Sequence, residues 1–186
     1  MKLYGSFTSP FVRHVRIVLL ETGLPCEFIE TDQASSAIKS PTKRVPFLED
    51  DAIFLTDSNS IIKYLREKAG QNFCKTAKEL DELCLVNTAL EVTTNLFFIK
   101  RDGVDINISP YLQRQAARID STLAELNKLP LSHAAPYTET QLRLACYIGW
   151  CKLRNQVDFS KFPNLENFYA GALNYPHFQA TQPPQS

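Results

Sequence analysis

The sequence predicts an α/β first half followed by an all-helical second half, and three observations support this fold class. The length of 186 residues accommodates two domains. Up to about Lys68, short apolar segments typical of strands alternate with segments of helical periodicity. From about Ala69 onward only helical patterns recur. We therefore expect one domain over residues 1–70 and a second, all-helical domain over residues 76–186.

The first domain is expected to follow the order β-α-β-(α)-β-β-α. Its predicted elements are a strand at 3–4, a helix over 10–21, a strand over 26–30, a polar loop or weak helix over 31–43, a hairpin of 47–48 and 53–55, and a helix over 58–68. The first helix has clear signals at both ends. Ser9 is a candidate N-cap, Pro10 suits the first helical position, and Gly23 suits a left-handed stop.

The second domain is expected to contain long helices over 77–100 and 110–126, a buried central helix, and a tail with one short helix and an irregular end. The central helix begins with a capping box, in which Thr138 caps the helix and Gln141 reaches back to it. The run from Leu144 to Trp150 is apolar nearly all round, which is typical of a buried helix.

The overall composition argues against several classes of protein. Lys and Arg number 20, as do Asp and Glu, so nothing indicates a polyanionic partner such as nucleic acid. The five cysteines are scattered without a CxxC pair, which fits reduced thiols in a cytoplasmic protein. The three histidines lie far apart, so no metal site is predicted. No signal peptide is visible, and no window approaches the length of a membrane span.

The most informative segment is Arg44-Val45-Pro46-Phe47-Leu48, which is followed by Thr56-Asp57-Ser58. Pro46 stands at the entrance to an apolar strand, where a residue without an N–H is unsuited to a central ladder position. Asp57 and Ser58 stand at the mouth of a helix, whose N-terminus favours anions. A stiff Val-Pro corner beside such a helix predicts a socket for a short peptide with free carboxylates.

Four motifs, in this order and spacing, resemble the bacterial glutathione S-transferase family. They are the opening Met1-Lys2-Leu3-Tyr4-Gly5-Ser6-Phe7-Thr8-Ser9-Pro10-Phe11-Val12-Arg13, the segment Ser40-Pro41-Thr42-Lys43-Arg44-Val45-Pro46-Phe47-Leu48 with Thr56-Asp57-Ser58, the capped helix at Thr138, and the ending Phe162-Pro163-Asn164-Leu165 with Tyr175-Pro176-His177-Phe178. The likeness covers essentially the whole chain. It implies a thioredoxin-like N-terminal domain, an all-helical C-terminal domain, a homodimer, and glutathione as cosubstrate.

The resemblance implies a serine-type active site in which Ser9 contacts the glutathione sulfur. A free thiol has a pKa of about 8.5, so little is thiolate at neutral pH, and the thiolate is the nucleophile. A hydroxyl donor and the positive end of a helix both favour the anion. The alternative is that Ser9 is only an N-cap, and Ser6 and Thr8 are rival hydroxyls in the same loop. Phe11, in the first helical turn, is included among the expected glutathione-binding residues.

The other expected glutathione contacts come from the socket. The resemblance implies a cis Val45-Pro46 bond, with the Val45 N–H and C=O free to pair with the cysteinyl part of glutathione. Arg44 is expected at the glycyl carboxylate, Ser58 at the γ-glutamyl carboxylate, and Asp57 at the neighbouring ammonium group. The structural alternatives are an ordinary strand-entry proline, a solvated charge at Arg44 and a plain helix cap at Ser58.

The site for a second substrate has few markers. Aromatic candidates to line an apolar pocket between the domains are Phe7, Phe11, Phe97, Phe98 and Tyr111, although residues of this kind more often belong to the core. Three departures from the family pattern concern binding or capping: Ser40 replaces a usual Asn, Thr42-Lys43 replaces a usual Gly-containing pair, and Gln141 replaces a common Asp.

The sequence thus predicts a cytoplasmic glutathione transferase that joins the glutathione sulfur to a small, partly apolar electrophile. Its expected partners are glutathione and this electrophile, with no nucleic acid, metal or membrane. Because position 9 is not cysteine, thiol-disulfide exchange through this residue is not expected. The alternatives are a non-catalytic binding or regulatory protein with the same fold, and a glutathione-dependent reductase or isomerase.

Overall fold

The computed structural model describes residues 1–184 and divides the chain into two compact units. The first unit contains Met1–Lys75 together with the described residues from Leu173 onward. The second unit contains Thr76–Ala172. The segment after Ala172, which the sequence placed in the helical domain, therefore clusters with the N-terminal unit.

The first unit is a thioredoxin-like domain built on a mixed four-stranded sheet in the order β2-β1-β3-β4. Its elements are β1 (Lys2–Gly5), α1 (Pro10–Thr22), β2 (Glu27–Glu30), α2 (Gln33–Lys39), β3 (Phe47–Asp50), β4 (Ile53–Leu55) and α3 (Ser58–Lys68). β1 is parallel to β2 and antiparallel to β3, and β3 is antiparallel to β4. The predicted order is confirmed, with the ambiguous polar segment now resolved as the short helix α2.

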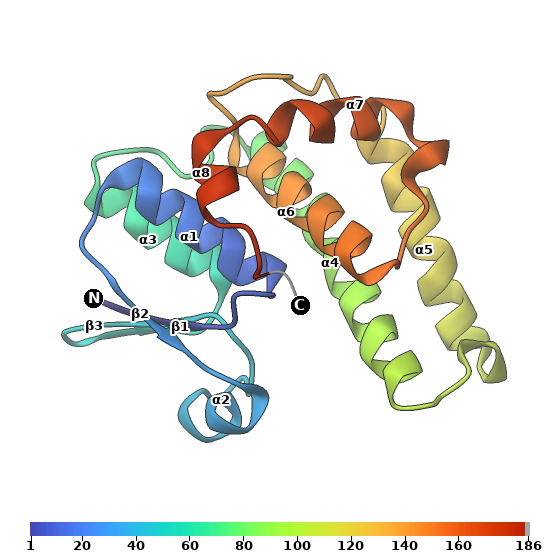
Figure 1. Cartoon of the computed structure of the whole chain (residues 1–186), viewed down its shortest axis with the longest axis horizontal. Helices are drawn as coiled ribbons and strands as arrows, with labels where there is room; N and C mark the ends of the chain where they lie inside the picture. The colour runs from blue at the N-terminus through green and yellow to red at the C-terminus, as the bar shows by residue number, and fades with distance from the viewer. Residues whose placement is uncertain (185–186) are drawn as a thin grey trace. The chain divides into compact units, whose positions relative to one another are not determined.

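The two faces of the sheet carry different side chains. Because side chains alternate along a strand, Leu3 and Leu48 point to one face, where they join a buried cluster with α1 and α3. These two helices lie side by side over the sheet, and α2 lies on its other side (Figure 1). Tyr4 and Phe47 stack with their ring centroids 4.5 Å apart, and the Lys39 ammonium of α2 lies 4.8 Å from the Tyr4 ring.

In the second unit, all regular secondary structure of the described residues is helical. Its elements are α4 (Ala77–Arg101), the 3₁₀ turn η1 (Ile106–Ile108), α5 (Pro110–Leu126), α6 (Glu139–Arg154), η2 (Phe159–Lys161) and α7 (Pro163–Ala172). The predicted capping box is present, because Gln141 N–H donates to the Thr138 hydroxyl and Thr138 N–H donates to the Gln141 side chain. The run from Glu139 to Cys151 is buried except at Gly149, which confirms α6 as the central helix.

Helix α4 is longer and more apolar than the sequence-based expectation about membrane spans allowed. Among the described helices it alone is long and apolar enough to cross a membrane by length and composition, and 33% of its apolar window is buried within the chain. The expectation that no window reaches this length was therefore wrong. However, α4 packs against α5 and α6, and a single helix of this kind is weak evidence for a membrane span.

The tail also differs from its predicted form of one short helix. After α7 the chain forms a further helix, α8 (Pro176–Ala180), which belongs to the first unit. Arg13 of α1 is buried and donates from Nη2 to the Phe178 carbonyl at 2.8 Å. Its guanidinium carbon lies 3.6 Å from the centroid of the Phe178 ring. At the other end of α1, the Tyr175 hydroxyl donates to Glu21 at 2.5 Å. The tail thereby holds α1 along its length.

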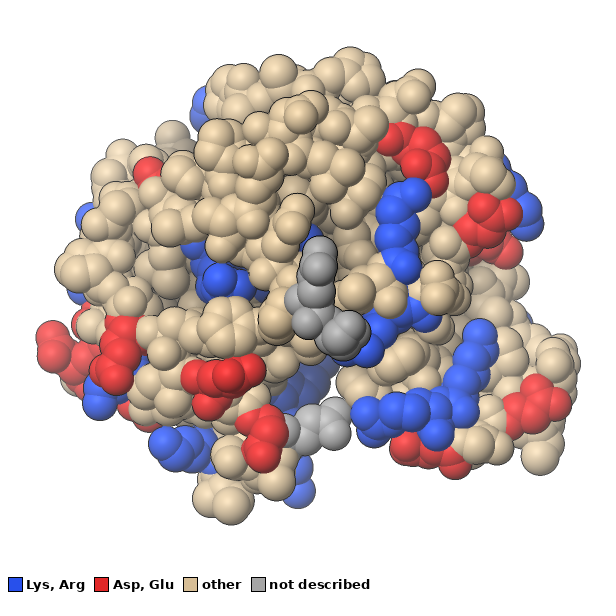
Figure 2. Space-filling model, in the orientation of Figure 1, with Lys and Arg blue, Asp and Glu red and all other residues tan. Residues whose placement is uncertain are grey.

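Charge is distributed without a dominant sign. Lys and Arg side chains and Asp and Glu side chains both occur across the face shown in Figure 2. This agrees with the formal net charge of zero.

Candidate functional site

The strand register brings the predicted site segments to one edge of the sheet. Tyr4 pairs with Phe47, so the end of β1 lies beside the start of β3. Leu48 pairs with Leu55, so the end of β4 also lies beside the start of β3, on the side away from β1. The loop after β1, the Val-Pro corner before β3 and the turn after β4 consequently share this edge. Neighbouring strands lie about 4.8 Å apart, so the three segments span roughly 10 Å.

Two helices begin at the same edge. α1 follows β1 after a short loop, and α3 follows β4 almost directly. α1 packs closely on the end of β1, because a Cβ at Gly5 would lie 2.6 Å from a methyl carbon of Val12. Neither helix has an acidic residue in its first turn. Both therefore present the positive end of a helix dipole, which favours a bound anion.

Ser9 is the N-cap of α1, and its side-chain oxygen accepts a hydrogen bond from the Val12 N–H at 3.4 Å. Its own N–H donates to the Ser6 carbonyl at 3.1 Å, which closes the loop. Within residues 1–184 the Ser9 hydroxyl proton has no acceptor. The rival hydroxyls of Ser6 and Thr8 bond to each other at 3.1 Å, which uses the proton of only one of them. Ser9 can thus cap the helix and still donate a hydrogen bond to a ligand, so its two predicted roles are compatible.

The Val45-Pro46 peptide bond is cis, as the sequence analysis expected. Pro46 is buried and Val45 is half-buried. In the described part of the chain, neither the N–H nor the C=O of Val45 has a hydrogen-bond partner. A half-buried peptide group in this state is ready to pair with an extended ligand in the manner of an added strand.

The loop before the corner is closed by local hydrogen bonds. The hydroxyls of Ser40 and Thr42 bond at 2.8 Å, and the Lys43 N–H donates to the Ser40 carbonyl at 2.9 Å. Lys43 has φ +53°, a left-handed conformation that favours glycine. This accounts physically for the glycine that is usual in the family at this pair of residues. Arg44 follows as an exposed cation, for which no ion pair exists among residues 1–184.

The N-cap of α3 differs from the alternative in which Ser58 is a plain helix cap. Asp57, not Ser58, is the N-cap, and one carboxylate oxygen accepts from the N–H groups of Asn59 and Ser60 at 2.8 and 3.1 Å. Ser58 is the first helical residue and is 5% exposed. A carboxylate and a helix N-terminus therefore lie side by side. The pair can receive an ammonium group and a carboxylate group of one ligand.

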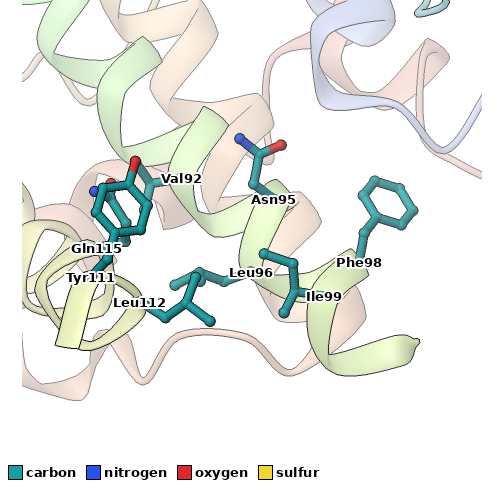
Figure 3. Close-up of a pocket in the computed structure, with 8 residues that line it drawn as sticks. All are labelled: Val92, Asn95, Leu96, Phe98, Ile99, Tyr111, Leu112 and Gln115. Atoms are coloured by element: carbon teal, nitrogen blue, oxygen red, sulfur yellow. The ribbon is translucent and has the colours of Figure 1, made fainter. Parts of the chain in front are cut away.

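The aromatic candidates do not form one cluster. Phe7 packs against Phe28, with ring centroids 4.7 Å apart, and Phe97 packs edge-on against Trp150 at 5.4 Å. Phe11 is half-buried in the first turn of α1. Phe98 and Tyr111 line a pocket within the second unit (Figure 3). Phe97 also packs edge-on against Phe98, with ring centroids 5.2 Å apart. None of the five is buried, and Tyr111 is 59% exposed, so they do not belong to the buried core.

Comparison with known proteins bears directly on this geometry. Residues 3–73 match the family model for the glutathione S-transferase N-terminal domain. Glutathione S-transferase Z2 of Arabidopsis thaliana is 27% identical over 202 residues, which cover 98% of this chain and 91% of that protein.

Solved structures extend the likeness. A glutathione S-transferase from Methylobacillus flagellatus, crystallised with glutathione bound, has a TM-score of 0.83 at 21% identity and covers 98% of this chain and 99% of its own. A bacterial zeta-class maleyl pyruvate isomerase has a TM-score of 0.74 at 20% identity, covering 98% and 97%. At these identities the structures show the fold. The match over residues 3–73 and the relatives that align along nearly the whole sequence show that the chain is similar to glutathione S-transferases along its length.

Proposed function

We propose that this chain binds glutathione at the sheet edge and holds its sulfur as a thiolate for attack on a small, partly apolar electrophile. It would then be a glutathione transferase of the serine type. One observation carries the proposal: the strand register brings the segments that contain Ser9, Val45 and Asp57 to the same edge of the sheet, where two helices begin, and we refer to these three residues as the row.

The dimensions of the row suit a tripeptide. Three neighbouring strands span roughly 10 Å, and three extended residues reach at most about 10–11 Å. In the proposed pose the γ-glutamyl end lies at Asp57 and Ser58, and the cysteinyl backbone pairs with Val45. The sulfur then lies at Ser9, and the exposed Arg44 neutralises the glycyl carboxylate.

The electrostatics of the row also suit glutathione. Each of its two carboxylates would meet a positive group, which is either the N-terminus of α3 or the Arg44 guanidinium. Lowering the pKa of the bound thiol by about two units requires roughly 2.7 kcal/mol of preferential anion stabilisation. A hydrogen bond to a charged group contributes about 1.5–3 kcal/mol, and a helix terminus contributes about 0.3–1 kcal/mol. Ser9 and α1 are therefore sufficient in principle.

A second reaction is favoured by the comparisons. A zeta-class transferase of Euphorbia esula is 26% identical over 98% of this chain, and the maleyl pyruvate isomerase shares the fold. In a cis–trans isomerisation the same thiolate would add to a double bond, allow rotation about the resulting single bond, and leave again. The proposed site supplies the thiolate for either reaction, so the substrate decides between conjugation and isomerisation.

We also propose that the chain acts in the cytoplasm as a homodimer, with glutathione and the electrophile as its partners. Nucleic acid, a membrane and a metal have no part in this proposal. Sedimentation velocity of the purified protein tests the dimer directly, because a single species at the monomer mass would contradict it.

The test of function combines binding and turnover. Calorimetric titration with glutathione is expected to show one site per chain, and the protein is expected to conjugate 1-chloro-2,4-dinitrobenzene or to isomerise maleylpyruvate. Ser9→Ala should lower turnover at neutral pH by up to about 25-fold, because a return of the thiol pKa from about 6.5 to about 8.5 lowers the thiolate fraction at pH 7 from roughly three-quarters to about 3%, while leaving glutathione affinity nearly unchanged. Ser6→Ala is the matched control and should retain turnover. A protein that binds no glutathione, or one that depends on Ser6 instead, would contradict the proposal.

A further inference from the structure

Two arginine side chains join the tail of the chain to α1. Arg13 is 5% exposed, and besides its bond to the Phe178 carbonyl it donates from Nε to the Thr181 hydroxyl at 3.4 Å. Arg16 donates from Nη1 to the Thr181 carbonyl at 3.3 Å. Phe178 and Thr181 are each 1% exposed, so the tail side of this contact is buried. We call these four residues the arginine clamp.

The clamp also contacts the loop that carries Ser9. The backbone N–H of Arg13 donates to the Ser9 carbonyl at 2.9 Å. The Arg16 guanidinium carbon lies 4.7 Å from the ring centroid of Phe7 and 5.4 Å from that of Phe28, so it forms cation–π contacts with both rings. Phe7 stands two residues before Ser9 in the same loop. The tail is thus connected to the chain on both sides of Ser9.

The local hydrogen bonds of Ser9 leave its hydroxyl weakly fixed. The N-cap bond from the Val12 N–H is 3.4 Å long, which exceeds the usual range of about 2.7–3.2 Å. A hydroxyl that stabilises a thiolate needs a fixed position, because a displacement of about 1 Å can lower a catalytic rate by about a hundredfold. The clamp supplies contacts to this loop in addition to its local hydrogen bonds.

Stability alone does not account for the burial of Arg13. Moving a guanidinium group out of water is costly, and apolar side chains of similar volume are often equally or more stabilising at such positions. Arginine differs from an apolar residue by its planar set of donors, which fixes the direction of its partners. Arg13 uses this plane for the Phe178 carbonyl and the Thr181 hydroxyl, while its face lies over the Phe178 ring. The contact therefore fixes how the tail is oriented on α1.

We propose that Arg13 and Arg16 are positioning residues, which use the tail to hold the Ser9 loop in the geometry that a bound thiolate requires. This proposal rests on the proposed function of Ser9 and adds a role for residues that act through it. Ser9 donates the hydrogen bond, and the clamp limits how far its hydroxyl moves. Loss of the clamp should weaken thiolate stabilisation and leave the affinity for glutathione nearly unchanged.

The test measures two quantities in the full chain. The first is amide hydrogen exchange of the peptide 5–12 without ligand, and the second is the pKa of the bound glutathione thiol. Thr181→Val removes the hydroxyl that accepts from Arg13. We expect it to speed the exchange by about fivefold and to raise the thiol pKa by about half a unit. Arg13→Lys keeps the charge but loses the planar donors, so its effects should be larger, about tenfold and about one unit.

Matched variants separate positioning from folding. Thr181→Ser retains the hydroxyl and should rescue both quantities to wild-type values. Gln182→Ala removes an exposed side chain of the same segment and should change neither quantity. Melting temperatures show whether each variant is folded. If Arg13→Lys does not fold, the comparison of Thr181→Val with Thr181→Ser decides the outcome.

Three results would overturn the role of the clamp while the proposed function stands. They are unchanged exchange in Thr181→Val, faster exchange with an unchanged thiol pKa, and wild-type values of both quantities in Arg13→Lys, because charge alone would then suffice. Failure of the proposed function is seen in the wild type instead, as absent glutathione binding or a bound thiol pKa of about 8.5. That result would overturn both proposals.

Discussion

The two helices that begin at the sheet edge are capped by different chemistry. The N-cap of α1 is the neutral hydroxyl of Ser9, with a single hydrogen bond of 3.4 Å. The N-cap of α3 is the carboxylate of Asp57, with hydrogen bonds of 2.8 and 3.1 Å. A charged cap offsets part of the positive end of its helix and adds a group that can bind a cation, whereas a neutral cap leaves that end fully available to an anion. The contrast suggests that α1 suits a thiolate and that α3 suits the zwitterionic end of an amino acid.

Giving α1 a charged cap like that of α3 should produce the largest loss of turnover. Ser9→Asp would place a carboxylate where the proposed thiolate lies, so like-charge repulsion should raise the thiol pKa. We expect turnover at neutral pH to fall by more than the roughly 25-fold loss from Ser9→Ala. Helix capping should be preserved, because Asp is a good N-cap. Steady-state kinetics and a melting curve measure the two effects. A fully active Ser9→Asp variant would show that Ser9 is only a cap.

The α3 cap should separate stability from binding. Asp57→Ala removes two hydrogen bonds and should cost about 1 kcal/mol of unfolding free energy, more than the cost of about 0.5 kcal/mol for Ser9→Ala. Asp57→Asn keeps a good capping residue but removes the charge, so it should restore stability while glutathione affinity stays reduced by about tenfold. Urea denaturation and calorimetric titration supply the two measurements. Equal glutathione affinity in wild type and Asp57→Asn would contradict the proposed ammonium contact.

Away from the site edge, Asp50 ties the end of β3 to α3. Lys68 and the Tyr64 hydroxyl donate to its carboxylate, the latter at 2.6 Å, and these hydrogen bonds lower the pKa of Asp50. A carboxyl with a lowered native pKa stabilises the fold above its unfolded pKa of about 3.9 and loses this contribution as pH falls through the native pKa.

Asp50→Asn should therefore be less stable than wild type at neutral pH, and the difference should shrink as the pH falls below about 4. Urea unfolding from pH 3 to 7 measures this trend. Asp51→Asn is the control, because Asp51 is exposed and makes no hydrogen bond or ion pair among residues 1–184. A difference between wild type and Asp50→Asn that is independent of pH would refute the assignment.

The smallest expected effect concerns the loop before the Val-Pro corner. Lys43 adopts a left-handed conformation that costs a non-glycine residue about 1–2 kcal/mol, whereas glycine loses about 0.5–1 kcal/mol more conformational entropy on folding. Lys43→Gly should consequently stabilise the chain by about 0.5 kcal/mol, without changing the site. Lys39→Gly, within α2, should destabilise it. A destabilised Lys43→Gly variant would show that the loop is not strained.

Elements with local signals at their ends were predictable from the sequence. Pro10 and Gly23 marked α1, and Thr138 with Gln141 marked the start of α6. Helix α2 could only be left open as a loop or a weak helix, because it is short and polar and Asp32, whose carboxylate accepts from the Ser35 N–H, was its main signal.

Features that depend on long-range contacts were not predictable. The tail joins the first unit through Arg13 and Phe178, which are 165 residues apart, and nothing near either residue indicates the contact. The identity of the α3 cap depended on backbone angles at Asp57 and Ser58 that composition does not determine.

The central claim is that Ser9 and the start of α1 hold a thiolate. The most direct measurement is the pKa of the bound glutathione thiol, followed by the ultraviolet absorbance of the thiolate as pH is raised, in wild type and in Ser9→Ala. We predict a pKa about two units below the free value of about 8.5 in the wild type, and a return toward that value in Ser9→Ala. A bound thiol that titrates like free glutathione, or a lowered pKa that Ser9→Ala leaves unchanged, would contradict this account.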